Sequence, residues 1–402
     1  MACASALLLV TACTVGGESE AGTPSTTTTR PEPTPIADLP GRLVVLDNAG
    51  NIVTVDPDGS SPAQVTDDSG EQARYTQPFF SPRSDRIAWS EITTTGFGIG
   101  LSDPEGADRT SIAMGAPPFY MYWSPDGRSI GVLHNGDLGV IDFEMVDVGA
   151  GTTAVVADGS PFYFSWSPDS DRVAAHVQQD LFTTIDLEGT ARAIGATAAE
   201  YQAPYWTPAG IFHLGPDGLE VRDLEGEGRL LATTPGPIAF VVNPQGTRVA
   251  AQSFVPQDEG GISAALSETP ALPANRVVVV DVESGELSEV TDDTSIGFFW
   301  SPDGQALMVL KPSAQSGLAD VLVWRAGEAR VLTTIAPQPL FVRDVLRFFD
   351  QYAQSLQLWS PDSSAVALAG VIDDQPGIWV QSIYGGDAVK VFDGSWAAWS
   401  HG

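Results

Sequence analysis

The chain has 402 residues, with 51 acidic side chains against 19 Lys and Arg, and a formal net charge of −32 at pH 7. This negative charge repels phosphate backbones, so nucleic acid is excluded from the expected partners. Hydrophobic residues make up 43% of the chain, and 41 Gly with 30 Pro supply many turns. The length suits either several average domains or one large all-β domain.

The N-terminus resembles a secretion signal. Residues 4–11 form a short apolar run, and small residues then precede Cys13. This pattern is similar to the bacterial lipobox, and the resemblance implies cleavage before Cys13 and attachment of a diacylglycerol to its sulfur. Residues 1–12 are therefore predicted to be a lipoprotein signal peptide. No Lys or Arg precedes the apolar run, although the n-regions of secretion signals are positively charged. An ordinary signal peptide with an incidental cysteine is the alternative.

The next segment, residues 13–40, is rich in Thr, Pro, Ser and Glu. Its low hydrophobicity cannot offset the entropy lost on ordering, which predicts a disordered linker. A lipid on Cys13 and a linker behind it predict a domain anchored to the cell membrane on the extracytoplasmic side. No later stretch is long and apolar enough to suggest a second membrane anchor.

A repeated unit fills residues 41–402. Each unit has an apolar or aromatic strand, a turn similar to Ser-Pro-Asp-Gly, and further strands. The residues at the first position of the successive turns are Ser81, Ser124, Ser167, Thr207, Asn243, Ser301, Ser360 and Ser400. Their spacings run from 36 to 59 residues, and a period of about 40–45 with strand signals is typical of a β-propeller with one blade per repeat.

The residue types suit this turn. Ser or Asn at its first position can bond to the backbone beyond it, Pro fixes φ at the second, and Gly suits the fourth. The large aromatic residue before the turn is interpreted as a wedge between neighbouring blades. These aromatics are Phe80, Trp123, Trp166, Trp206, Trp300, Trp359 and Trp399.

The repeats resemble the TolB-like family, whose propeller units are also called PD40 or WD40-like repeats. The resemblance rests on the W-S-P-D-G turns and on the Val-Thr-Asp-Asp elements that end at Asp68 and Asp293. It implies an all-β propeller over residues 41–402. TolB proteins also carry an N-terminal α/β domain, and here the linker stands in that place.

The two ends of the repeat region complement each other. The unit ending at Gly402 supplies only a first strand, whereas residues 43–66 supply later strands without a first one. We expect the C-terminal strand to pair with the N-terminal strands and close the ring. This predicts eight blades; seven is the alternative if the degenerate unit around Asn243 is not independent.

Two insertions explain the longest spacings, residues 255–274 and 337–355. We expect both on one face of the propeller, where variable loops commonly bind partners; tolerated loop drift is the alternative. The second has apolar residues near helical spacing and is predicted to form a short helix. Its Arg343 and Arg347 are candidates for docking an acidic partner.

Aromatic residues near the starts of first strands form a second candidate site, at the mouth of the channel. Rigid, amphipathic rings of this kind bind sugars and peptides well, although packing between blades explains them equally. The candidates are Tyr75, Tyr120, Tyr163, Tyr201 and Trp396.

Searches for chemistry find no catalytic motif. Residues 261–265 lack the last Gly of a G-x-S-x-G elbow. Strand alternation puts His176 on the opposite face from His134 and His213, so no three-histidine metal site is expected. No cofactor is predicted, and a weak Ca²⁺ site between blades is the alternative to solvated acidic turns.

The sequence therefore predicts a monomeric lipoprotein of the cell envelope whose propeller is a non-catalytic scaffold for another envelope protein. The alternatives are glycan or small-ligand binding at the channel mouth, and a propeller-type hydrolase or lyase with carboxylates from distant loops.

Overall fold

The computed structural model describes residues 32–178, 181–196, 202–255 and 269–402. The predicted signal peptide, Cys13, Tyr201 and most of the first insertion lie outside these residues. Within the described ranges, no helix has the length and apolar character needed to cross a membrane.

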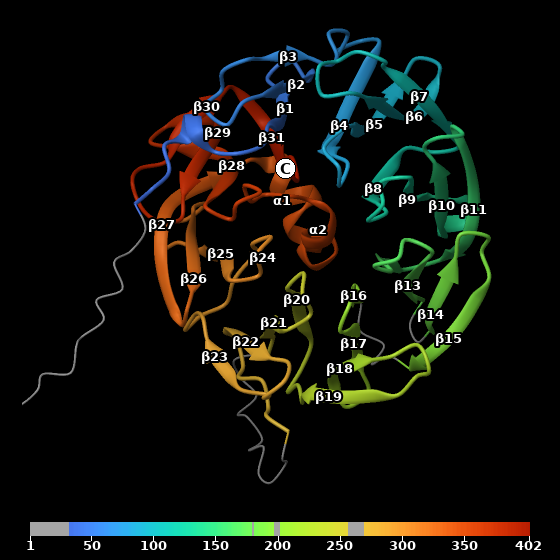
Figure 1. The fold of residues 1–402 in the computed structure, drawn as a ribbon, viewed down its shortest axis with the longest axis vertical. Coiled ribbons are helices and arrows are strands. Elements are labelled where there is room, and N and C mark those ends of the chain that lie inside the picture. Colours follow the sequence, from blue (N-terminus) through green and yellow to red (C-terminus); the bar gives the residue numbers. More distant parts are fainter. Residues whose placement is uncertain (1–31, 179–180, 197–201, 256–268) are drawn as a thin grey trace, which may run out of the picture. The chain divides into compact units, whose positions relative to one another are not determined.

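The described chain is almost entirely β-structure, arranged as sheets that follow one another around a ring (Figure 1). Neighbouring strands within every sheet are antiparallel. Five four-stranded sheets follow the chain order: β4(Ala73–Phe80), β5(Ile87–Thr93), β6(Gly96–Ser102), β7(Thr110–Met114); β8(Pro118–Trp123), β9(Ser129–Asn135), β10(Ile141–Asp147), β11(Thr152–Gly159); β12(Phe162–Trp166), β13(Arg172–Val177), β14(Leu181–Asp186), β15(Ala191–Ala196); β16(Tyr205–Thr207), β17(Gly210–Gly215), β18(Gly218–Arg222), β19(Gly228–Ala232); β20(Ile238–Val242), β21(Arg248–Ser253), β22(Val277–Asp281), β23(Leu287–Glu289).

A seven-stranded sheet follows. Its strands are β24(Gly297–Trp300), β25(Ala306–Pro312), β26(Ala319–Arg325), β27(Glu328–Pro337), β28(Ala365–Ile372), β29(Gln375–Ser382) and β30(Val389–Phe392). Strand β27 joins β28 through only two residue pairs, Ala336 with Val371 and Pro337 with Gly370. An isolated antiparallel bridge pairs Trp359 with Val366 of β28, at the position where the repeat places a first strand.

The remaining sheet combines the two ends of the described chain. Its order is β3(Ala63–Gln64), β2(Ile52–Val55), β1(Leu43–Asp47), β31(Gly394–Trp399). Leu43 lies opposite Trp399 and Asp47 opposite Gly394. The end of the predicted linker is also folded here: a 3₁₀ helix spans Ile36–Asp38, Leu39 is buried, and the Pro40 carbonyl accepts a hydrogen bond from the Trp399 indole at 2.9 Å.

The Ser-Pro-Asp-Gly-like turns have the predicted hydrogen bonds. The Ser124 hydroxyl accepts the Ser129 N–H at 3.0 Å, the Ser301 hydroxyl accepts that of Ala306 at 2.9 Å, and Asn243 Oδ1 accepts that of Arg248 at 3.0 Å. These bonds tie the end of each first strand to the start of the second, as the residue types predict.

Some turns carry Ser where Gly is expected, and these serines link one turn to the next. Ser84, Ser170 and Ser363 have φ of 58°, 64° and 61°, values that are strained for a residue with a side chain. The Ser170 hydroxyl accepts the Asp126 N–H at 3.0 Å, and the Ser363 hydroxyl accepts the Asp303 N–H at 3.0 Å. The Ser84 hydroxyl accepts the His401 N–H at 2.8 Å, so a hydrogen bond that glycine could not make accompanies the strain in each case.

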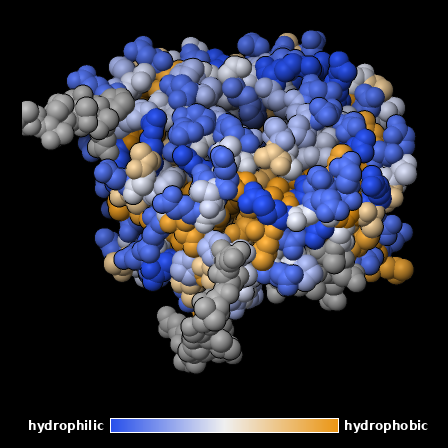
Figure 2. All heavy atoms as spheres, turned by 60° about the horizontal axis from the view of Figure 1, so that its bottom comes forward, coloured by the Kyte–Doolittle hydropathy of each residue, from blue (hydrophilic) through white to orange (hydrophobic). Residues whose placement is uncertain are grey.

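Three of the aromatic wedges show the predicted packing. The indole N–H groups of Trp166, Trp300 and Trp359 donate to carbonyls on the earlier first strands β8, β20 and β24, at 3.0, 2.9 and 3.2 Å. Trp166 and Trp359 are almost completely buried. Each of the three rings therefore packs toward an earlier first strand while its polar atom stays bonded. The face seen in Figure 2 is largely hydrophilic, with hydrophobic side chains gathered around and below the centre of the view.

Candidate functional site

The second insertion forms two short helices and not one. Helix α1 spans Pro339–Asp344, a 3₁₀ turn spans Leu346–Phe348, and α2 spans Phe349–Ser355. The fully buried Val345 separates them. Of the predicted apolar stripe, Leu346, Phe349 and Tyr352 are buried, whereas Val342 is 46% exposed.

Helix α2 lies near the centre of the ring (Figure 1). The Gln351 amide donates to the Phe164 carbonyl and the Tyr120 hydroxyl, both at 2.8 Å, and its oxygen accepts the Phe164 N–H at 3.1 Å. The Tyr352 hydroxyl donates to the Phe119 carbonyl at 2.8 Å. Polar residues of α2 thus pair with the first strands β8 and β12, and the insertion is bound into the molecule at this helix.

Asp350 joins α2 to residues at the start of the next sheet, β16 to β19. Its carboxylate accepts the Ala203 N–H at 3.2 Å, and its carbonyl accepts the Tyr205 hydroxyl. Burial raises the pKa of Asp350 to about 6 and outweighs the backbone hydrogen bonds that lower it. Burial likewise raises the pKa values of Tyr120 and Tyr205 well above their usual range.

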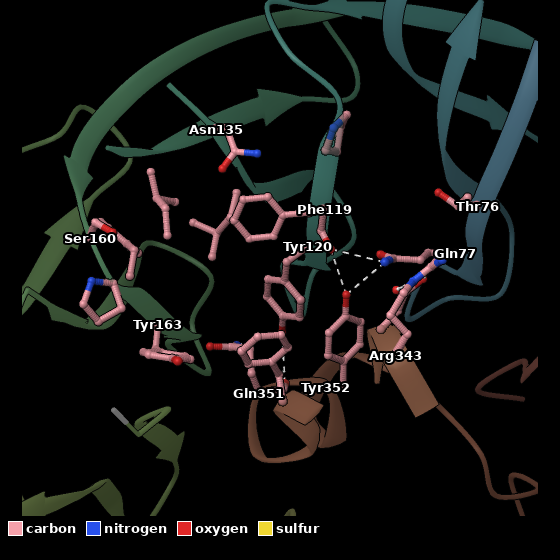
Figure 3. A pocket seen from close by; sticks show the side chains of 17 residues that line it. Thr76, Gln77, Phe119, Tyr120, Asn135, Ser160, Tyr163, Arg343, Gln351 and Tyr352 are labelled. Atoms are coloured by element: carbon pink, nitrogen blue, oxygen red, sulfur yellow. Dashed lines mark hydrogen bonds and ion pairs between the residues drawn. The ribbon is translucent and has the colours of Figure 1, made fainter. Parts of the chain in front are cut away.

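A pocket of about 600 Å³ opens between the insertion and strands β4, β8 and β12. Its walls include Phe119 and Phe348, which are 36% and 39% exposed, and the half-buried Tyr163. In Figure 3, Gln77, Arg343 and Tyr352 lie on one side of Tyr120, and Ser160 and Tyr163 on the other. This size and this largely apolar lining are typical of small-molecule sites.

Gln77 is the strained residue of the pocket. Its φ is 54°, at a bulge where the register between β4 and β5 shifts after Thr76. Its amide donates to the Tyr352 hydroxyl at 3.0 Å and to the Phe119 carbonyl at 3.2 Å. The bulge therefore turns a side chain of β4 toward the insertion, and strained residues of this kind cluster at functional sites.

Among the lining residues, Arg343 and Asp344 carry the formal charges. Two hydrogen bonds join them, from Arg343 Nε to Asp344 Oδ1 at 2.5 Å and from the second guanidinium nitrogen to Oδ2 at 2.9 Å. Hydrogen bonding to Asp344 raises the pKa of Arg343 further, so the guanidinium stays charged. The other polar lining groups, on Thr76, Gln77, Asn135, Ser160 and the tyrosines, are amides and hydroxyls.

The structure brings together three of the residues proposed from the sequence: Tyr120, Tyr163 and Arg343 line this pocket. Arg347 is exposed and lies over the Phe348 ring, 5.4 Å from its centroid. Tyr75 is buried, with its hydroxyl bonded to Asp68 at 2.5 Å.

Trp396 is also buried, and it donates to the Pro78 carbonyl at 2.9 Å. Tyr75 and Trp396 therefore fill space between sheets, which is the packing alternative for the aromatic set. Sequence reasoning missed Gln77, Phe119 and Asn135, because the pocket they line exists only where the insertion folds inward.

His134, His176 and His213 lie on the second strands of their sheets, and each has its own partner. His134 Nε2 is 2.8 Å from Glu144, His176 Nδ1 is 3.2 Å from the Gln202 carbonyl, and His213 Nε2 accepts from Arg222 at 2.8 Å. In the ranges that the structure describes, no three His, Cys, Asp or Glu side chains gather in a group that could hold a metal ion.

Comparison with known proteins identifies the fold. No protein-family model and no curated protein sequence matches the chain. An oligogalacturonate lyase in complex with manganese is similar in structure, with 12% identity over 86% of this chain and 98% of the lyase and a TM-score of 0.54. A prolyl endopeptidase structure has 14% identity over 82% of this chain and 50% of that protein, with a TM-score of 0.52.

TolB from Acinetobacter baumannii has 16% identity over 75% of this chain and 63% of TolB, with a TM-score of 0.40. At such identities a structural likeness shows the fold alone. The lyase and the endopeptidase, together with the antiparallel sheets, confirm the prediction of an all-β propeller.

Proposed function

We propose that the chain is an extracytoplasmic lipoprotein, anchored through Cys13, whose propeller binds a small ligand in the pocket between the insertion and β4, β8 and β12. The pocket carries this proposal. It is concave, about 600 Å³ in volume, and combines exposed aromatic rings with amides and hydroxyls. Convergent polar groups in an apolar cavity are the usual features of a small-molecule site.

We further propose an eight-bladed ring closed by the pairing of β1 with β31. The unit around Asn243 has a four-stranded sheet of its own, β20 to β23, which argues against seven blades. The seven-stranded sheet counts as two blades, because only two residue pairs join β27 to β28. Closure by β31 also removes two sheet edges that would otherwise invite aggregation.

We prefer ligand binding to the scaffold function because polar side chains of the insertion are bound inside the molecule. Asp350, Gln351 and Tyr352 are buried against the first strands. The contacts of these side chains are therefore made within the molecule, and they hold the insertion in place as one wall of the pocket. No catalytic step is part of this proposal.

The test is a ligand-observed NMR screen of small polar and aromatic compounds against the whole chain purified in detergent. Phe119→Ala should weaken binding of the hits by about tenfold, because an aromatic contact contributes on the order of 1 kcal/mol beyond its buried area. Phe97→Ala is the matched control, since Phe97 is 37% exposed but lies on β6, away from the pocket. Hits that bind both variants equally would overturn the proposal.

Protein binding is the second candidate, favoured by the exposed side chains of the insertion. Val342 is 46% exposed, and Arg343 and Arg347 are exposed cations in a chain of net charge −32. An envelope protein with an acidic, partly apolar surface would complement them. Capture from native membrane extract tests this: a partner recovered by the parent chain should be lost with Val342→Ser and Arg347→Ala together, and retained with Phe97→Ala.

A further inference from the structure

We propose that the ligand of this pocket is an uncharged saccharide, an inference that rests on the proposed function. Three features of the lining lead to this class: its charge, its aromatic surfaces and the kind of hydrogen-bonding groups at its edge.

The charge of the lining argues against acidic ligands. Asp344 occupies the guanidinium of Arg343 through two hydrogen bonds of 2.5 and 2.9 Å, so this pair contributes no net charge. A carboxylate taken into the pocket would need an uncommitted cation, and burying it without one is costly. The net charge of −32 on the whole chain adds long-range repulsion of anions.

The aromatic surfaces suit the apolar face of a sugar ring. Phe119 on β8 and Phe348 on the insertion come from two different walls and are 36% and 39% exposed, and the half-buried Tyr163 adds a third ring from β12. A pyranose presents C–H groups on its face, which pack against aromatic rings through apolar and weak C–H contacts. Rings on separate walls allow a saccharide to be held from more than one side.

The edge groups suit sugar hydroxyls. Asn135 and Ser160 are exposed at the pocket, and their side chains make no hydrogen bond to another residue within the part of the chain that the structure describes. Amides and hydroxyls both donate and accept, as sugar hydroxyls do, so they pair with a polyol without a change of protonation. A purely apolar aromatic ligand would leave these groups without partners, which is costly where they lose water.

The experiment uses the whole chain in detergent on an array of neutral gluco-, galacto- and manno-oligosaccharides beside uronic-acid oligosaccharides, followed by calorimetry on the tightest binder. A neutral saccharide should bind tightest. Phe119→Ala and Asn135→Ala should each weaken it by about tenfold, whereas Phe97→Ala should leave it unchanged. Thermal unfolding of each variant verifies that it is folded.

A charge variant tests the reasoning directly. Asp344→Asn releases Arg343 from its ion pair, so the variant should gain affinity for uronic-acid oligosaccharides while the parent chain shows none. Tighter binding of uronic acids by the parent chain would overturn the inference. The inference would also be overturned if no saccharide on the array bound while compounds from the NMR screen still bound and lost affinity with Phe119→Ala. In that result the proposed ligand-binding function of the pocket would stand. The absence of both kinds of binding would refute the pocket function as well.

Discussion

Asp350→Asn should stabilise the protein at neutral pH. The carboxyl group is buried at the centre of the ring, and its pKa is about 6 in the folded state against a usual 3.8. A shift of this size corresponds to about 3 kcal/mol, at about 1.4 kcal/mol for each pH unit. Asn keeps an oxygen for the Ala203 N–H but has no charge to bury.

The sign follows from where the protons bind. Below about pH 3 the carboxyl is protonated in both states, and its burial costs no ionisation energy. Between about pH 4 and 6 the unfolded state releases the proton while the folded state keeps it, so the stability of the folded state falls across this range and then stays constant above it. The variant and the parent chain should therefore be closest in stability near pH 3, and the variant should be more stable by about 3 kcal/mol near pH 7.5.

Urea unfolding of the two proteins across this pH range measures the difference between them. Subtraction removes the effect of the other carboxylates, which titrate in both. Asp387→Asn, at an exposed position, controls for the loss of one negative charge. A difference that does not change with pH, or a variant that is less stable at neutral pH, would refute the account of Asp350.

Three further predictions follow from packing and from the leader. Trp399→Ala should lower stability by about 3–5 kcal/mol in urea unfolding, because Trp399 is fully buried beside β1; a loss as small as that of an exposed residue would contradict the role of β31. Ser363→Ala should cost about 1–2 kcal/mol by removing the bond from Asp303, and Ser363→Gly should cost less because glycine relieves the φ of 61°; equal thermal midpoints for the two variants would argue against strain. Cys13→Ser should move the protein from the membrane to the soluble fraction, and retention in the membrane would exclude the lipid anchor.

The repeats made the fold predictable because their information is local. Each Ser-Pro-Asp-Gly-like turn is specified by a few consecutive residues, and its hydrogen bonds are those that the residue types require.

The pocket was less predictable because it depends on contacts between distant segments. Asp350 and Gln351 have polar side chains, which hydropathy assigns to the surface, yet both are buried against strands about 150 to 230 residues away in sequence. Hydropathy cannot show that backbone groups of the first strands are free to pair with them. The sequence could identify Tyr163 and Arg343 as candidates, but not the fold of the insertion that brings them together.

The pairing of β1 with β31 has a consequence for the order of folding. Leu43 and Trp399 are adjacent in space but are separated by most of the chain. Bringing such ends together costs about 5 kcal/mol of loop entropy if the chain between them is still flexible. The cost becomes small once the intervening sheets have formed, because those sheets already hold the two ends close. Strands β1 to β3 should therefore remain unprotected against hydrogen exchange until the last strand arrives, and the ring should complete its folding at the seam.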